Sequence, residues 1–163
     1  MSFEDTRIYR TGKRLYDGAF AGTSLVVPGI LSSANKYIID FVHDIEVVAQ
    51  TDVYVDPDGT TVGSTADICA SVAEDVYYIS RWYEGFEAGL RFMRTTNSYG
   101  VVAHAEIDPR LGGLSQFRSF CQGRGGPVPN RAMIGRTTVD FTSLTIRATH
   151  ALNGYVRVTE VSL

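Results

Sequence analysis

The sequence predicts a mainly β protein: an antiparallel β-sandwich or small barrel with one medium helix, one short helix and an extended N-terminal arm. Three observations predict this class. Apolar and polar residues alternate with a period of two over 45–55 and 101–107, turn residues bound these segments, and Asn153-Gly154 interrupts the last apolar stretch. With 163 residues, of which 44% are hydrophobic and 20% charged, the chain can form one domain with a sizeable core.

Residues 1–34 are predicted to form the extended arm, and 35–163 a single β-rich domain. Basic residues of the arm alternate with spaced apolar ones, and its glycines interrupt any helix. Large apolar groups on an arm have to pack against the body of the protein or against a neighbouring subunit. The arm residues that we expect at an interface are Arg7, Ile8, Tyr9, Arg10, Leu15, Tyr16 and Phe20.

The clearest internal strand covers 37–55. From Asp44 onward its odd-numbered residues are mostly apolar, which places them on a core face, and its even-numbered residues form an acidic, solvated face. Because this stretch is longer than a typical strand, we expect a bend or bulge near His43. The segment 56–59, Asp-Pro-Asp-Gly, then ends the strand in a type I turn.

A helix is predicted over 65–75. Its apolar stripe, which continues beyond 75, steps by four, four, three and four residues, and the segment 64–67 resembles a capping box. From Asp75 onward, alternating aromatic and branched residues favour a strand instead. The stripe consists of Ile68, Val72, Val76, Ile79 and Tyr83.

Four further segments precede the C-terminal region. Residues 86–94 and 100–107 are predicted to pair as antiparallel strands, and Leu114–Cys121 to form a short helical turn. A glycine-rich loop follows at 122–136, but it lacks the Gly-Lys-Ser/Thr end of a phosphate-binding loop. Its bases have no acidic neighbours in sequence and form a second candidate interface, made of Arg124, Arg131 and Arg136.

Residues 143–163 are predicted to form a β-hairpin that closes on Asn153-Gly154. This dipeptide supplies the two positive-φ positions of a type I′ turn and is the strongest short-range hairpin signal. The resulting register places Arg147 opposite Glu160 and Ile146 opposite Val161. Each such pair contributes roughly 0.2 to 1 kcal/mol.

Charge is segregated along the chain. Residues 37–80 hold nine acids and no Lys or Arg, and the rest carries +6, for a net charge of −3. These segments either neutralise each other within one fold or form complementary faces between copies. There are thirteen Arg and only two Lys, with nine Tyr and eight Phe. Protein–protein interfaces are enriched in Arg, Tyr and Phe and depleted in Lys. Codon usage in a GC-rich genome would also raise the number of Arg over Lys.

Metal and cofactor chemistry has a weak signal. His104 and Glu106 fall on one face of a strand, and His150, or His43, could supply a further ligand. A cupin-like site would need two histidines one residue apart, followed by a glutamate. The segment 104–106 has only one histidine, so we expect neither a metal nor a cofactor. Cys69 and Cys121, far apart and without a Cys-x-x-Cys motif, are expected to be free thiols.

These observations favour a structural subunit of a symmetric assembly, with a tailed-phage virion component (capsid decoration, tail tube or neck) as the leading example. Its partners would be copies of itself and other structural proteins of a particle assembled in the host cytoplasm. We expect no membrane partner, and no nucleic acid beyond incidental phosphate contact by the 122–136 loop, because the pI is near 5.6. The alternatives are a small cupin-like metalloenzyme or ligand-binding protein using His104, Glu106 and His150, and a module that binds other proteins.

Overall fold

The fold is known from a computed structural model, which describes residues 12–29, 32, 34–43, 51–57, 64–73, 76–95, 100–111, 114–124, 130–137 and 142–162. Within these ranges, side chains are described for residues 12–29, 32, 34–43, 51–56, 89–93, 101–108 and 142–162.

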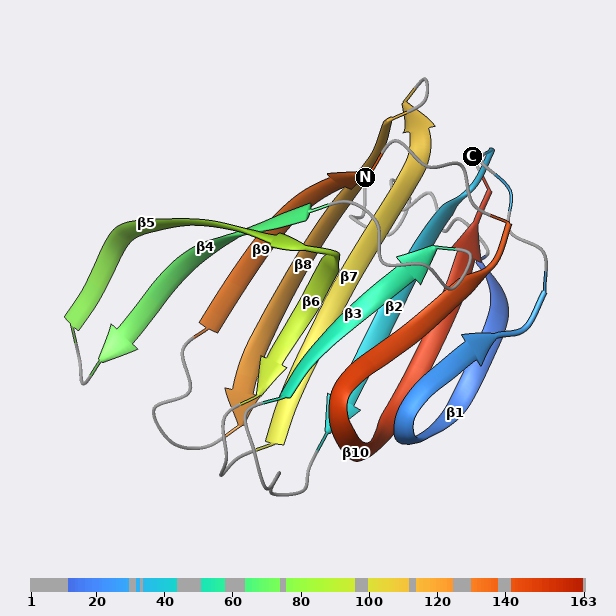
Figure 1. The fold of residues 1–163 in the computed structure, drawn as a ribbon, viewed down its shortest axis with the longest axis horizontal. Coiled ribbons are helices and arrows are strands. Elements are labelled where there is room, and N and C mark those ends of the chain that lie inside the picture. Colours follow the sequence, from blue (N-terminus) through green and yellow to red (C-terminus); the bar gives the residue numbers. More distant parts are fainter. Residues whose placement is uncertain are drawn as a thin grey trace, which may run out of the picture.

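The described residues form ten β-strands and no helix (Figure 1). The strands are β1 (Lys13–Val27), β2 (Lys36–His43), β3 (Thr51–Pro57), β4 (Ser64–Ala73), β5 (Val76–Ala88), β6 (Leu90–Thr95), β7 (Gly100–Leu111), β8 (Leu114–Arg124), β9 (Asn130–Thr137) and β10 (Leu144–Val161).

All ten strands belong to one antiparallel sheet that is nearly closed as a barrel. The strand order is β5-β4-β9-β8-β7-β2-β10-β3-β6, with β1 paired to β10 outside this path. Strand β6, at one end of this order, packs across β7, β8 and β9 and encloses the core with them (Figure 1). The predicted mainly β, antiparallel class is confirmed.

Strand β10 joins two layers of the sheet that face each other across the core, one formed by β3 and β6 and the other by β2, β7, β8 and β9. Its first part, Leu144–Ala148, pairs with β3, and its last part, Tyr155–Val161, pairs with β2. Strand β1 runs beside both parts. Between them, residues 148–151 of β10 lie opposite the single residue Thr23, and this bulge marks the bend that is visible in Figure 1.

The predicted hairpin over 143–163 is therefore wrong, because Asn153-Gly154 lies inside a strand. Gly154 pairs with Phe20 of β1, and its φ is not in the left-handed region. A Cβ at Gly154 would lie 2.7 Å from Phe41 Cε1 and 2.7 Å from the Val42 carbonyl oxygen. Glycine is needed there for close approach of β2 and not for a turn.

The part of the predicted arm that the structure describes is β1, a strand of the domain's own sheet. Phe20, expected at an interface, is 1% exposed and lies in the core with its ring 5.4 Å from that of Phe41. Leu15 and Tyr16 are partly buried against the same core. Residues 1–11, which include the other arm residues, lie outside the described part.

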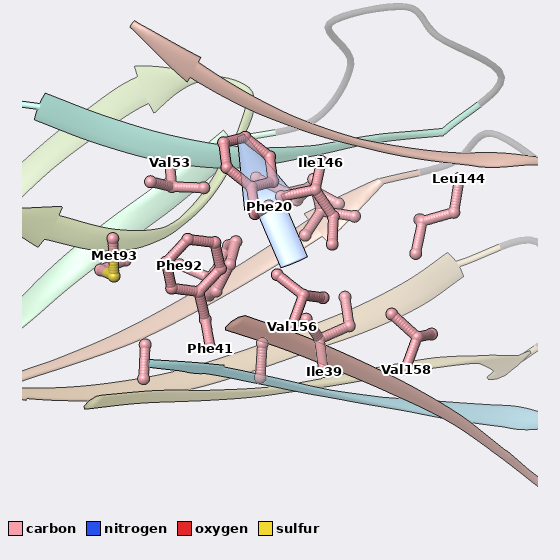
Figure 2. Close-up of a cluster of buried hydrophobic side chains, with 14 of the residues drawn as sticks. Phe20, Ile39, Phe41, Val53, Phe92, Met93, Leu144, Ile146, Val156 and Val158 are labelled. Atoms are coloured by element: carbon pink, nitrogen blue, oxygen red, sulfur yellow. The ribbon is translucent and has the colours of Figure 1, made fainter. Parts of the chain in front are cut away.

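The core lies between the two layers, with side chains from opposing strands pointing toward one another (Figure 2). The predicted alternation is confirmed on β7. On β3 the apolar face is confirmed, but the solvated face is not, because Tyr54, expected there, is buried. Val53 and Val55 of β3 have no exposed surface, and every second residue of β7 from Val101 to Ile107 is buried. Phe92 of β6 completes the aromatic centre, with its ring centre 6.1 Å from that of Phe41.

The helix predicted over 65–75 is the strand β4, and the helical turn predicted at 114–121 lies in β8. In the stripe, Ile68, Val72 and Val76 are spaced by four residues. Four is an even number, so this spacing fits a strand as well as a helix. Strand β4 pairs with β5 on one side and with the distant β9 on the other, and these hydrogen bonds between strands decide its conformation.

Two further expectations concern strand ends and partners. The stretch 37–55 is two strands, with β2 ending at His43 and residues 44–50 outside the described part. The predicted pairing of 86–94 with 100–107 is wrong. Strand β6 pairs with β3, whereas β7 pairs with β2 and β8. At Gly89, φ is 104°, and this residue separates β5 from β6.

Candidate interface on the outer face of the sheet

The outer face of β1, β10, β2 and β7 carries two clusters of paired polar side chains. Its residues alternate with the core residues of the same strands, and the registers align them in three rows across the four strands. In the order β1, β10, β2, β7, the mixed row is Arg14, Thr159, Ile38, Glu106; the charged row is Asp17, Arg157, Asp40, His104; and the apolar row is Ala19, Tyr155, Val42, Val102.

Asp17 connects the β1 end of these rows. Its Oδ2 atom lies 2.5 Å from Arg14 Nη1 and 3.6 Å from Arg157 Nε, and the Tyr155 hydroxyl donates a hydrogen bond to its Oδ1 atom. That hydrogen bond, together with the two guanidinium charges, lowers the pKa of Asp17. The same bond raises the pKa of Tyr155. Asp17 is therefore a carboxylate, and Tyr155 a neutral donor, at neutral pH.

His104 connects the β7 end, between two carboxylates. Its Nδ1 atom lies 2.8 Å from Asp40 Oδ1 and its Nε2 atom 3.6 Å from Glu106 Oε1, while Lys36 Nζ lies 2.6 Å from Glu106 Oε2. Partial burial alone would raise the pKa of Glu106. The hydrogen bond and charge of Lys36, with a contribution from His104, outweigh it and lower that pKa.

The apolar row borders the charged row. Tyr155 is 47% exposed and Val102 41%, while Val42 between them is half-buried. Isolated exposed apolar side chains are ordinary on a protein surface. Here Tyr155, Val42 and Val102 are successive neighbours on β10, β2 and β7, so they form a continuous apolar strip beside paired charges. Such a strip with a polar border is typical of a protein–protein contact.

The three histidines do not gather. His43 points into the core, where its Nδ1 atom lies 2.5 Å from the Asn153 carbonyl oxygen, whereas His104 lies on the outer face. His150 lies in the β10 bulge beside Thr149. Within the described residues, no three His, Cys, Asp or Glu side chains form a group that could hold a metal ion. His104 and Glu106 do share a face, as predicted, but with Asp40 and not with His150.

The predicted basic loop is mostly strand. Arg124 ends β8, and Arg131 and Arg136 lie on β9, where only their backbone is described. Arg131 pairs with Cys121 on one side and Cys69 on the other. Two strand spacings, about 10 Å, therefore separate the cysteines, and this is too far for a disulfide within one chain.

Arg147 and Glu160, predicted to face each other, have other partners. Arg147 binds Asp56 of β3 with Nε 2.5 Å from Oδ2, and its guanidinium carbon lies 4.5 Å from the centre of the Tyr54 ring. Glu160 accepts a hydrogen bond from the buried Tyr37 hydroxyl. Burial, with Glu160 beside it, raises the pKa of Tyr37, although a hydrogen bond to the Ser32 carbonyl opposes this.

The residues of the three rows other than His104 and Glu106 were not predicted as site residues. A signal for three of them, Ile38, Asp40 and Val42, exists in 36–43, where even-numbered residues alternate with residues that are buried, Tyr37, Ile39, Phe41 and His43. The sequence offers no such signal for Asp17 and Arg157, because their neighbours come from strands distant in the chain.

No helix in the described part is long and apolar enough to cross a membrane.

Comparison of the chain with models of protein families, with curated proteins and with solved structures finds no match.

Proposed function

We propose that this protein is a structural subunit that associates with copies of itself in a larger assembly. The observation that carries the proposal is the apolar row, in which Tyr155 and Val102 are exposed on adjacent parts of one broad sheet face. Burial of apolar surface is the main driving force of protein association, and aromatic residues are enriched where it occurs.

The charges of this face support the same function. Asp17, Arg157, Glu106 and their neighbours are already paired within the face, so they can enter an interface without leaving an uncompensated charge. Ion pairs at the border of an interface give specificity and orientation more than affinity. The excess of Arg, Tyr and Phe over Lys in the sequence fits this role.

The setting that we propose is a virion, with the protein as a capsid decoration, tail-tube or neck component. This part of the proposal rests on the composition of the sequence. In that setting, the partners are further copies of the chain and other structural proteins of the same particle.

Native mass measurement of the purified protein tests the function. The expected result is a mass that is a multiple of 17.9 kDa and falls on dilution. A mass of one chain at every concentration would refute self-association. Metal analysis of the same sample tests the metalloenzyme alternative, which requires a stoichiometric transition metal that is lost on His104→Ala substitution.

A further inference from the structure

We propose that two copies of this chain pack face to face through the three rows of the outer face, related by a two-fold axis that runs parallel to the strands. This inference rests on the proposed function and specifies the surface and the orientation of the contact. The partner is a second copy of the same chain.

The geometry of the axis determines which residues meet. A two-fold axis that lies between two stacked sheets and parallel to their strands keeps the height along each strand and reverses the strand order. Each row then meets the same row of the partner in reverse order, so β1 lies over the partner's β7 and β10 over the partner's β2. Aligned sheets pack about 10 Å apart, which leaves one layer of side chains from each copy between them.

Reversal makes the charged row complementary to itself. Its order across the sheet is Asp17, Arg157, Asp40, His104, so negative groups alternate with Arg157 and the imidazole. In reverse, Arg157 meets the partner's Asp40, and Asp17 meets the partner's His104. The mixed row behaves in the same way, because Arg14 at one end meets the partner's Glu106 at the other.

The apolar row is matched as well. Tyr155 meets the partner's Val42, and Ala19 meets the partner's Val102, so the exposed ring packs on a half-buried branched side chain. The smallest side chain of the row faces an exposed valine. All three rows are therefore satisfied by the same orientation.

Other orientations and partners fit less well. An axis across the strands, centred on the charged row, would keep the strand order and place Asp17 on the partner's Asp17 and Arg157 on the partner's Arg157. Like charges in such positions oppose association. The three rows contain Arg14 and Arg157 against three carboxylates, with His104 and the adjoining Lys36 beside these, so the face has little net charge with which to attract a strongly charged partner such as nucleic acid.

A charge-exchange experiment tests this interface. The full chain is prepared as Asp40→Arg and, separately, as Arg157→Asp. In a dimer of either variant, two like-charge contacts replace the two contacts between residues 40 and 157, and we expect the dissociation constant to rise tenfold or more. Mixing the variants restores opposite charges at both contacts, so a mixed dimer of near wild-type affinity is expected. Native mass spectrometry detects it, because the two variants differ in mass.

Tyr155→Asp tests the apolar row independently and is expected to weaken association by a similar factor. Val26→Asp is its matched control: Val26 is the more exposed of the two, at 64%, and lies outside the three rows. Thermal unfolding of each variant at low concentration shows whether its fold is retained. If a charge variant does not fold, the comparison of Tyr155→Asp with Val26→Asp decides the question.

The outcomes separate the two proposals. A wild-type protein that is monomeric at all concentrations overturns both. A wild-type oligomer that is unaffected by Tyr155→Asp and by both charge variants overturns this interface and leaves self-association through another surface. Loss of association in the single charge variants without recovery in the mixture overturns the proposed orientation.

Discussion

Substitution of Gly154 by alanine is the sharpest test of the fold, because a hairpin and a continuous strand predict different results. In the structure, the added Cβ would lie 2.7 Å from both Phe41 Cε1 and the Val42 carbonyl oxygen. Ordinary contact begins at 3.4 Å, so the neighbours would have to move by about 0.7 Å. One of these atoms belongs to the backbone of β2, which is paired on both sides, and the other to the ring of Phe41, which has no exposed surface.

We expect Gly154→Ala to reduce the free energy of unfolding by about 3 kcal/mol, at the upper end of the range for overpacking. For a chain of this size, that corresponds to a fall in the melting temperature of about 6 to 12 °C. Asn153→Ala should change stability by less than about 0.5 kcal/mol, because its side chain is exposed and its carbonyl oxygen, which remains, accepts the contact from His43. Gly22→Ala is the matched control. At Gly22, φ is 95° and no atom lies within 4 Å of the added Cβ, so only backbone strain of about 1 to 2 kcal/mol arises.

Urea unfolding of the variants measures these differences, and Phe41→Leu separates their causes. Removing the ring should make Gly154→Ala less costly, whereas Gly22→Ala and Phe41→Leu should add independently. The reasoning is refuted if Phe41→Leu leaves the cost of Gly154→Ala unchanged while Asn153→Ala is clearly destabilising. A type I′ turn predicts that pattern, because it requires positive φ at both residues, so both substitutions would strain the backbone without involving Phe41.

Three further predictions concern β1, the outer face and β3. Phe20→Ala should lower the free energy of unfolding by about 3 to 5 kcal/mol, because Phe20 is a core residue; a change below about 1 kcal/mol in urea unfolding would favour an arm outside the domain. Glu106→Gln should cost about 0.5 kcal/mol at pH 7. The lowered pKa of Glu106 means that its contribution is present above the ordinary value of 4.5 and is lost as the pH falls through the pKa of the folded state. Thermal unfolding at pH 7 and pH 3 should therefore show the gap from wild type closing in acid, and a constant gap would contradict the assignment. Arg147→Met should cost about 2 kcal/mol by leaving Asp56, 3% exposed, without its guanidinium partner, and Asp56→Asn in the Arg147→Met background should recover part of this in urea unfolding.

The faces of several strands could be predicted from the sequence, because alternation is a local property. Val53 and Val55 fall on the buried side of β3 as the pattern predicts, and so do Val101, Ala103, Ala105 and Ile107 on β7. A period of two requires only that one face be apolar, and no knowledge of the neighbouring strand is needed. The same locality explains the error at 65–75, where steps of four residues satisfy both a helix and a strand.

Strand partners could not be predicted, because pairing depends on segments far apart in the chain. At Asn153-Gly154 the strongest local turn signal gives way to pairing with β1 and close packing on β2, each more than a hundred residues earlier. The glycine is required there by the Phe41 ring, a contact that no local pattern contains. The candidate site follows the same rule. His104 and Glu106 were predicted on one face from their spacing, but Asp40 joins them only through the register of β2 with β7.

The outer face depends on strand β10 for its formation, and this has a consequence for the proposed assembly. Arg157 and Tyr155 occupy the second position of the charged and apolar rows, and without β10 nothing in the described part pairs with β1. The same strand carries Ile146 into one layer of the core and Val156 into the other (Figure 2). Contacts of such large sequence separation form late, since the entropy of closing the intervening chain is lost before they contribute. The outer face is thus complete only when the core is closed, so the proposed interface would select folded subunits and exclude partly folded ones.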